Sequence, residues 1–300
     1  MSRAEEVRPE RAAETQPLEL PEQFPDEVEV FACDLDRTLI GADVVLHGRT
    51  LAAIAAAHAA GIRVLIVTGR MFRSARPYAE AAGIREPIVC YQGAAVVDTP
   101  SGRFIRHEPI PLDVARETIT AVQSDGYTLN AYVGDELFVA EMTPEAERYA
   151  TFQKLPVHEV GDLLAWLDEP PTKLVTVGPA DELTALKESM KTRFGDVLHV
   201  SKSLPIFLEF SRRGVTKGSG LAWLASEIGF TAERTVAFGD GENDVEMLEW
   251  AGLGIAVADA DESALAAADL VCPPAAEEGV AQVIEAFLDG RDRRAESSRA

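Results

Sequence analysis

Residues 28–39 read Val-Glu-Val-Phe-Ala-Cys-Asp-Leu-Asp-Arg-Thr-Leu, an apolar, β-branched run that ends in two aspartates, an arginine and a threonine. The run from Val28 to Cys33 predicts a short buried strand of a parallel sheet. Side chains alternate between the faces of a strand, so Asp34 and Asp36 are expected to project the same way. Two adjacent carboxylates repel each other unless a cation neutralises them, and a hard divalent cation prefers such oxygen ligands. Taken alone, however, the Asp-Leu-Asp pattern is more often a polar turn than a catalytic site.

The composition indicates a globular protein with one large domain or two ordinary ones. The chain has 300 residues, 47% of them hydrophobic, and its mean hydropathy is close to zero. Its net charge of −22 argues against a nucleic-acid-binding surface and against docking on anionic membranes. An anionic substrate is still compatible with this charge where local cations or a metal override the global field.

The expected compartment is the cytoplasm. The acidic N-terminus has no apolar segment typical of a secretory signal. Three widely separated cysteines, Cys33, Cys90 and Cys272, lie in or beside apolar runs and are expected to be buried free thiols.

Helices and apolar strands alternate on both sides of the middle of the chain. Before it, the pattern predicts a helix, a strand, a helix and a strand at residues 48–60, 63–67, 71–82 and 87–91. After it, strands are predicted at 207–210, 235–238 and 254–257, and helices at 217–229, 245–251 and 278–288. This alternation is typical of a parallel sheet covered by helices on both faces. We therefore predict an α/β fold with a Rossmann-like, doubly wound parallel sheet.

The middle of the chain breaks this rhythm and predicts an inserted second domain. A hairpin is expected around residues 95–106, followed by helices at 112–124 and 181–194 and strands at 127–133, 136–139, 173–177 and 197–200. Such an α+β module is long enough to bury its own core. The expected division is a disordered tail at 1–25, a catalytic core at 26–108 and 206–290, an insertion at 109–205 and a second disordered tail at 291–300.

Four polar clusters occur where predicted strands end or a predicted helix begins. They are Asp34/Asp36/Thr38, Thr68/Gly69/Arg70, Thr216/Lys217 and Asp240/Asn243/Asp244. In an open α/β sheet the carboxyl ends of the strands share one edge, where ligands bind, so residues two hundred positions apart can meet there. Each cluster alone could be a helix cap, a polar turn or a solvated surface lysine. Their joint placement favours a functional site.

The residue types indicate phosphoryl transfer. Asp34, Asp36 and Asp240 would form a carboxylate-rich pocket suited to Mg²⁺. Thr68, with its hydroxyl and the adjacent backbone N–H groups of Gly69 and Arg70, suits a phosphate, as does the compact cation of Lys217. An aspartate can act as a covalent nucleophile in such chemistry.

These motifs resemble those of the haloacid dehalogenase superfamily, in particular its Cof-like phosphatases with a type IIB cap. Asp34-Leu35-Asp36-Arg37-Thr38-Leu39 is similar to the first motif, Val67-Thr68-Gly69-Arg70 to the second, Gly214-Val215-Thr216-Lys217-Gly218 to the third, and Gly239-Asp240-Gly241-Glu242-Asn243-Asp244-Val245-Glu246-Met247-Leu248 to the fourth. The fourth match is the most specific, and the resemblance extends from about Val28 to Leu288.

The resemblance implies a role for each residue. Asp34 would attack phosphorus to form an aspartyl-phosphate, and Asp36 would act first as acid and then as base. Lys217 would shield Asp34 and help to hold the phosphoryl group. The remaining roles are phosphate binding by Thr68, Gly69, Arg70 and Asn243, orientation of Lys217 by Asp244, and Mg²⁺ binding by Asp34, the backbone carbonyl of Asp36, and Asp240. The insertion would be the cap that closes over the pocket and selects the leaving group.

Three positions depart from the family pattern. Arg37 replaces a common glycine, Gln92 replaces the usual asparagine of an Asn-Gly-Ala turn, and Asp259 lies where Asn-Ala is common. Because Arg37 lies between Asp36 and Thr38, we expect it to reach toward the substrate or the cap.

Three functions are compatible with these motifs. The first is a Mg²⁺-dependent phosphatase that hydrolyses a small phosphomonoester, such as a sugar phosphate or a phosphorylated cofactor. The second is a sugar phosphomutase or phosphotransferase on the same scaffold, and the third is a non-catalytic protein that binds a phosphorylated metabolite. The intact pair of Asp34 and Asp36 argues against the third, since binding alone needs no nucleophile and acid together.

Overall fold

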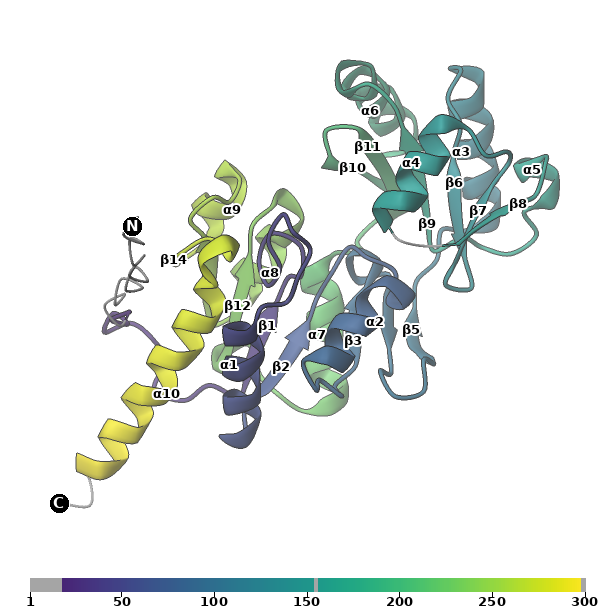
Figure 1. The fold of residues 1–300 in the computed structure, drawn as a ribbon. Helices are drawn as coiled ribbons and strands as arrows, with labels where there is room; N and C mark the ends of the chain where they lie inside the picture. Colours follow the sequence, from purple (N-terminus) through teal and green to yellow (C-terminus); the bar gives the residue numbers. More distant parts are fainter. Residues whose placement is uncertain (1–17, 154–155, 298–300) are drawn as a thin grey trace, which may run out of the picture.

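The computed structural model describes residues 18–153 and 156–297, which form two lobes built on separate sheets (Figure 1). One lobe contains a five-stranded parallel sheet with the order β14 (Leu270–Cys272), β13 (Leu253–Val257), β12 (Thr235–Gly239), β1 (Val30–Cys33) and β2 (Arg63–Ile66). Every neighbouring pair in this sheet is parallel, which confirms the predicted α/β class. Strand β1 lies between β2 and β12, so the residues that follow these three strands emerge side by side.

Helices cover both faces of the parallel sheet, which explains why β1 is apolar throughout. Phe31 packs in one core with Ile54 of α1 (Gly48–Ala59) and Phe287 of α10 (Gly279–Ser297). Its neighbour Ala32 faces a second core with Leu224 of α7 (Lys217–Ile228), which also takes residues of α8 (Val245–Trp250) and α9 (Glu262–Ala267). Alternate residues of one strand therefore fill two different cores.

A small antiparallel sheet extends this lobe beside helix α2 (Phe72–Ala81). It consists of β3 (Ile88–Cys90), β4 (Ala95–Val97) and β5 (Phe104–His107), and a parallel bridge between Val67 and Val89 links it to the end of β2. Strands β4 and β5 form the predicted hairpin. The turn η1 (Tyr91–Gly93) follows β3 and carries three consecutive residues with positive φ.

The second lobe is a six-stranded mixed sheet with helices. Its strand order is β10 (Leu198–Leu204), β11 (Phe207–Arg212), β9 (Lys173–Val177), β6 (Asn130–Val133), β7 (Glu136–Val139) and β8 (Val157–Glu159), and its helices are α3 (Leu112–Ser124), α4 (Pro144–Gln153), α5 (Leu163–Trp166) and α6 (Ala180–Phe194). Ile119 of α3, Leu174 of β9 and Leu186 of α6 belong to a core separate from those of the first lobe.

Strand β11 is in this second sheet and not in the parallel sheet where the sequence pattern placed it. Residues Phe207–Phe210 pair antiparallel with β9 and β10. An apolar strand looks the same in either sheet, because its side chains are buried on both faces in each case. A division at residues 205 and 206 would cut the hairpin between β10 and β11, and we propose that the insertion extends to about residue 213.

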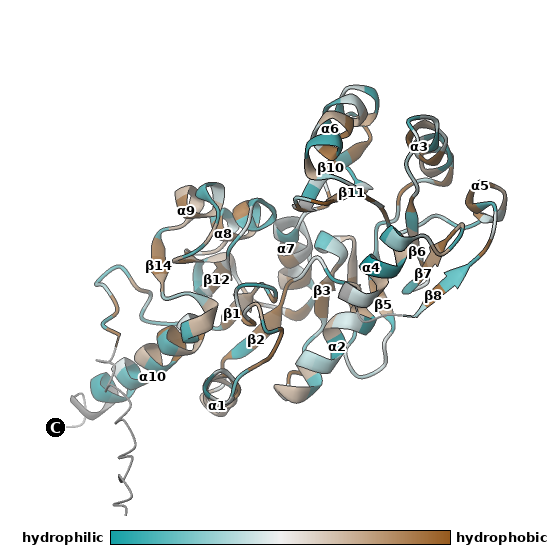
Figure 2. Ribbon diagram, turned by 45° about the horizontal axis from the view of Figure 1, so that its top comes forward, coloured by the Kyte–Doolittle hydropathy of each residue, from teal (hydrophilic) through white to brown (hydrophobic). Residues whose placement is uncertain are grey.

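Helix α10 replaces part of the expected C-terminal tail. It runs to Ser297, and Arg291 donates to the carbonyl of Ala60 at 3.2 Å. Figure 2 shows the helix changing from apolar beside the sheet to hydrophilic at its far end, and that charged end is what resembled a disordered segment. At the other terminus, Phe24 is buried and its ring lies 5.6 Å from that of Phe287, so the expected tail at 1–25 is wrong for this part; residues 1–17 lie outside the described residues.

Within the described residues, no helix combines the length and the apolar character needed to span a membrane.

Candidate active site

A buried lysine joins two of the predicted polar clusters. The Nζ atom of Lys217 lies 2.6 Å from Oδ1 of Asp34 and 2.6 Å from Oδ1 of Asp244. The three residues are at most 3% exposed, although they come from the ends of β1 and β12 and the start of α7. A buried charge is tolerated only when it is paired, so this lysine requires its two carboxylates.

The start of helix α7 sets the position of Lys217. Thr216 is the N-cap: its Oγ1 accepts from the N–H of Ser219, and the N–H of Thr216 donates to Oγ of Ser219 at 2.9 Å. This reciprocal capping box begins the helix at Lys217. The polar cluster Thr216/Lys217 therefore combines a capping residue with a cation at the sheet edge.

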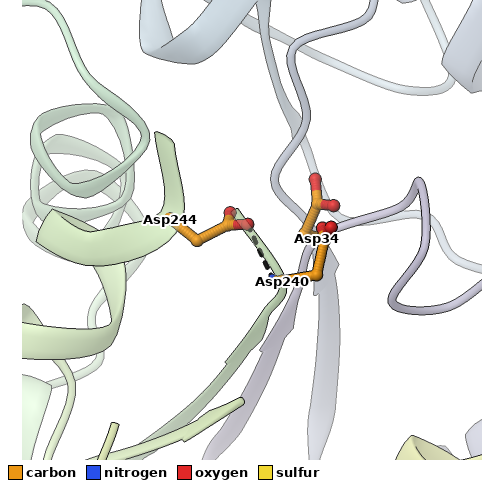
Figure 3. A group of neighbouring side chains, drawn as sticks. All are labelled: Asp34, Asp240 and Asp244. Carbon is orange, nitrogen blue, oxygen red and sulfur yellow. Dashed lines mark hydrogen bonds between the residues drawn. The ribbon is translucent and has the colours of Figure 1, made fainter. Parts of the chain in front are cut away.

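Three carboxylates form a candidate cation site (Figure 3). One oxygen each of Asp34, Asp240 and Asp244 lies within 4.8 Å of the others. The second oxygen of Asp244 accepts from the N–H groups of Asp240 and Gly241, each at 3.0 Å, which fixes the turn after β12. Clustered oxygen ligands of this kind suit a hard divalent cation.

The electrostatics of the cluster also favour a cation. Burial raises the pKa of Asp34 despite the opposing charge of Lys217, and the nearby Asp244 and Asp240 raise it further. Burial and the charge of Asp244 raise the pKa of Asp240 to about 6, against Lys217 and Arg37. Negative charge is therefore undercompensated here, and a divalent ion would relieve it.

Of the three side chains that the sequence assigned to the metal, that of Asp36 turns away. Its carboxylate receives two hydrogen bonds from Arg70, from Nε at 2.7 Å and from Nη2 at 2.5 Å. Arg70 in turn stacks over the ring of Tyr78 and donates to Oγ of Ser74. The guanidinium of Arg70, a residue that we assigned to phosphate binding, thus holds the side chain of the predicted acid and base. A role for the backbone carbonyl of Asp36 stays a prediction.

The predicted phosphate-binding residues lie together beside this pair. Oγ1 of the buried Thr68 accepts from the N–H of Arg70 at 3.1 Å, and Nδ2 of Asn243 donates to Oε1 of Gln92 at 3.0 Å. The amide of Gln92 also packs on Gly69, where an added Cβ would lie 2.4 Å from Nε2 of Gln92. Gln92 therefore links the second and fourth motifs. The sequence showed that Gln92 departs from the Asn-Gly-Ala pattern, but it did not show this contact.

Gly93 allows η1 to approach helix α7. It has φ +94°, and a Cβ there would lie 2.0 Å from the carbonyl oxygen of Thr216. We expect Gly93→Ala to lower the free energy of unfolding by about 2 kcal/mol or more beyond the cost of the positive φ, because backbone must move. Gly214→Ala is the matched control, since Gly214 has φ +74° with no atom within 4 Å of the added Cβ. Equal urea-unfolding midpoints and slopes for the two variants would contradict the expectation.

Among the described residues, the contacts of Arg37 are with the acidic cluster and not with the insertion, so of our two expectations only a contact with substrate stays a prediction. Its Nη1 lies 3.0 Å from Oδ2 of Asp240 and 3.8 Å from Oδ1 of Asp261, and its Nη2 donates to the carbonyl of Asp259. Asp259, the third departure, contributes its backbone to this contact.

A cleft of about 350 Å³ separates β10 of the second lobe from the start of α8. His199, Ser201 and Lys202 line one wall, and Thr216, Glu242 and Asn243 line the other. Because Thr216 precedes Lys217 and Asn243 lies beside Gln92, the cleft adjoins the polar site. Sequence reasoning missed the β10 residues because isolated polar residues on a strand carry no motif.

Comparisons with known proteins agree with this geometry. A family model described as haloacid dehalogenase-like hydrolase matches residues 31–284. The chain is 29% identical to the 5-amino-6-(5-phospho-D-ribitylamino)uracil phosphatase YitU of Bacillus subtilis, over 86% of this chain and 97% of the relative. It is also 29% identical to the pyridoxal phosphate phosphatase YbhA of Escherichia coli, over 86% and 98%.

Solved structures give the same result. A haloacid dehalogenase-like hydrolase from Bacteroides thetaiotaomicron is 27% identical, with a TM-score of 0.79 over 86% of this chain and 99% of that one. A protein from Thermotoga maritima is 30% identical, with a TM-score of 0.77 over 86% and 97%. The similarity thus includes both lobes.

Proposed function

Because the chain belongs to the haloacid dehalogenase-like hydrolases and is a Cof-like phosphohydrolase, we propose that it hydrolyses a small phosphomonoester with Mg²⁺ through an aspartyl-phosphate. The observation that carries this proposal is the position of Lys217 between Asp34 and Asp244, next to the three-carboxylate cluster. This arrangement would supply a nucleophile, a cation for the phosphoryl group and a metal site within one cluster of side chains.

In the proposed first step, a carboxylate oxygen of Asp34 attacks phosphorus. A bond forms between that oxygen and phosphorus, and the bond between phosphorus and the leaving oxygen breaks. Asp36 supplies the proton that the leaving oxygen needs. In the second step Asp36 takes a proton from water, which attacks phosphorus and releases orthophosphate and the free carboxylate of Asp34. The contact with Arg70 keeps the Asp36 side chain from turning toward the metal cluster.

The other residues bind and orient the phosphoryl group. Lys217 neutralises charge on its oxygens, and Thr68 and Asn243 supply neutral donors with the N–H group of Gly69. Mg²⁺, when bound by Asp34, the backbone carbonyl of Asp36, and Asp240, would stabilise the negative charge that develops on phosphorus. Asp244 orients Lys217 and the turn after β12 through its two oxygens.

The insertion would act as a cap that excludes water and selects the leaving group. The cleft between β10 and α8 adjoins the phosphate residues, and polar side chains such as His199, Lys202 and Glu242 are among those that line it. The two curated relatives are named as phosphatases of a ribitylaminouracil phosphate and of pyridoxal phosphate. We propose that this chain likewise accepts a sugar phosphate or a phosphorylated cofactor.

Metal removal tests the proposal. We expect EDTA to lower orthophosphate release from a panel of sugar phosphates and phosphorylated cofactors by about 100-fold or more, and Mg²⁺ to restore it, because the charge on phosphorus then lacks its main counter-ion. Asp240→Asn should need more Mg²⁺ for half-maximal rate. Activity that EDTA does not change would contradict the proposed metal dependence. Formation of an isomeric ester without free orthophosphate would indicate the mutase alternative.

A further inference from the structure

An aspartate of the insertion accepts three hydrogen bonds from the catalytic lobe. Asp135 lies in the turn between β6 and β7 and is 8% exposed. Its carboxylate accepts from the N–H of Phe72 at 3.0 Å, from the N–H of Arg73 at 2.9 Å and from the hydroxyl of Tyr91 at 2.7 Å. All three donors belong to the other lobe. No proposed catalytic role involves this residue.

Asp135 acts as the missing N-cap of helix α2. The residue at the N-cap position is Met71, which makes no side-chain capping bond, so the free N–H groups of the first turn depend on Asp135. A carboxylate there also interacts favourably with the helix dipole. Gly134 and Asp135 both have positive φ, and this tight turn directs the carboxylate at the helix. Helix α2 starts two residues after Arg70.

The third donor, Tyr91, connects Asp135 to the turn at residues 91–93, on the other side of the predicted phosphate site. Tyr91 and Gln92 adopt the left-handed conformation at φ 54° and 59°, which is strained for residues with side chains. The N–H of Tyr91 also donates to the carbonyl of Arg70 at 2.9 Å. Asp135 therefore lies where the segment carrying Thr68 and Arg70 meets the turn carrying Gln92.

A second residue of the insertion, Lys173, contacts the segment that carries Gly69 and Arg70. Nζ of Lys173, on β9, donates to the carbonyl of Gly69 at 3.3 Å and to Oε1 of Glu209 at 3.2 Å. The Lys173 side chain is buried, and its ammonium also lies 5.1 Å from the ring centre of Tyr132. The insertion thus contacts residues 69–73 on either side of Arg70.

We propose that Asp135 is a positioning residue for phosphate: by capping α2 and anchoring Tyr91 it holds the 68–70 and 91–93 turns in their phosphate-binding geometry. The inference rests on the proposed function. Asp135 does not line the cleft assigned to the leaving group, so its effect passes through the phosphoryl site alone. Its loss should weaken the binding of every phosphate ester, and of orthophosphate itself, by the same factor.

The test compares Asp135→Ala with Asp135→Asn and with a neighbouring control. Asparagine keeps one acceptor oxygen and should rescue part of the loss. Glu136→Ala is the control, because Glu136 is the next residue but forms only surface contacts, with Arg73 at 3.1 Å and with His158 at 3.3 Å. The measurements are the inhibition constant of orthophosphate, kcat and KM for two esters with unlike leaving groups, and amide hydrogen exchange of residues 68–93 in the full chain.

We expect Asp135→Ala to raise the inhibition constant of orthophosphate about 10-fold, to lower kcat/KM by one common factor for both esters, and to speed exchange at the start of α2. Asp135→Asn should be intermediate and Glu136→Ala close to the unchanged protein. If Asp135→Ala does not fold, Tyr91→Phe is the alternative variant. It removes one hydrogen-bond donor to Asp135 and should still weaken the binding of orthophosphate.

Either of two results would overturn the inference: a folded Asp135→Ala protein with an unchanged inhibition constant and unchanged exchange, or a loss that differs between the two esters. An unchanged protein that released no orthophosphate from any ester would instead contradict the proposed function. In that case hydrogen exchange in Asp135→Ala would still decide whether Asp135 holds the two turns.

Discussion

Asp34→Asn is expected to lower kcat by at least about 10³-fold, because an amide cannot form the acyl phosphate. The variant should fold, since Lys217 keeps its partner Asp244 and asparagine fills the same volume. The measurement is single-turnover orthophosphate release in saturating Mg²⁺, together with mass spectrometry of the peptide that carries residue 34 after acid quenching. The unchanged protein should show a phosphorylated peptide that hydroxylamine removes.

Asp259→Asn is the matched control for this change of charge. Asp259 is exposed at the rim of the site, and it is its backbone carbonyl that accepts from Arg37. Its kcat should stay within a factor of about two of that of the unchanged protein, in line with other surface substitutions. If Asp34→Asn kept more than a few per cent of the activity, the nucleophile would have to be another group or a water molecule.

Lys217→Met should lower the free energy of unfolding and weaken the binding of phosphate. Methionine has nearly the length of lysine but no charge, so Asp34 and Asp244 would face each other unpaired in a buried site, with Asp240 close by. Removing one partner of a buried ion pair typically costs about 3–5 kcal/mol. We expect urea unfolding in EDTA to show a loss of this size, and Mg²⁺ to recover part of it because the ion neutralises the same carboxylates.

The control for this variant is Lys191→Met on helix α6. Lys191 is exposed, and its replacement should change the free energy of unfolding by less than about 0.5 kcal/mol. Orthophosphate binding should be lost in Lys217→Met and retained in Lys191→Met. A Lys217→Met protein as stable as the unchanged one in EDTA would mean that the carboxylates are neutral when no metal is present.

The site also shows how an acidic protein can accept an anionic substrate. The chain carries a net charge of −22, which would repel a phosphate ester at long range. Three cations, however, lie at the polar edge of the sheet: Lys217 inside the cluster, Arg37 on Asp240 and Arg70 on Asp36. These cations are each paired with a carboxylate, so the local charge would favour an anion once a divalent cation is bound at the three-carboxylate cluster. Interactions over a few ångströms in a buried site then exceed a screened global field.

Much of the catalytic lobe could be predicted from the sequence. Apolar runs of four to six residues that alternate with helical patterns lead to a parallel sheet, and parallel strands place their carboxyl ends at one edge. That rule alone brings Asp34, Thr68 and Asp240 together from positions far apart in the chain. It depends on backbone periodicity, which a single sequence carries.

The errors and omissions arose where two distant partners had to be chosen. Strand β11 pairs with β9 and β10 in the second sheet. Its apolar residues would be buried equally well in the parallel sheet, so its sequence could not show which sheet it joins. Arg70 pairs with Asp36 and Arg37 with Asp240 because of side-chain geometry at the sheet edge, which no local pattern specifies.

The sequence by itself thus determined the fold class and the residue types at the edge of the parallel sheet, since both follow from periodicity and from the ends of strands. Tertiary structure alone decided which charges pair, that Gln92 links the second and fourth motifs, and that Asp135 caps a helix of the other lobe. Hydrogen bonds and ion pairs act over about 3 Å. Contacts so short depend on the relative placement of whole elements, and that placement exists only once the chain has folded.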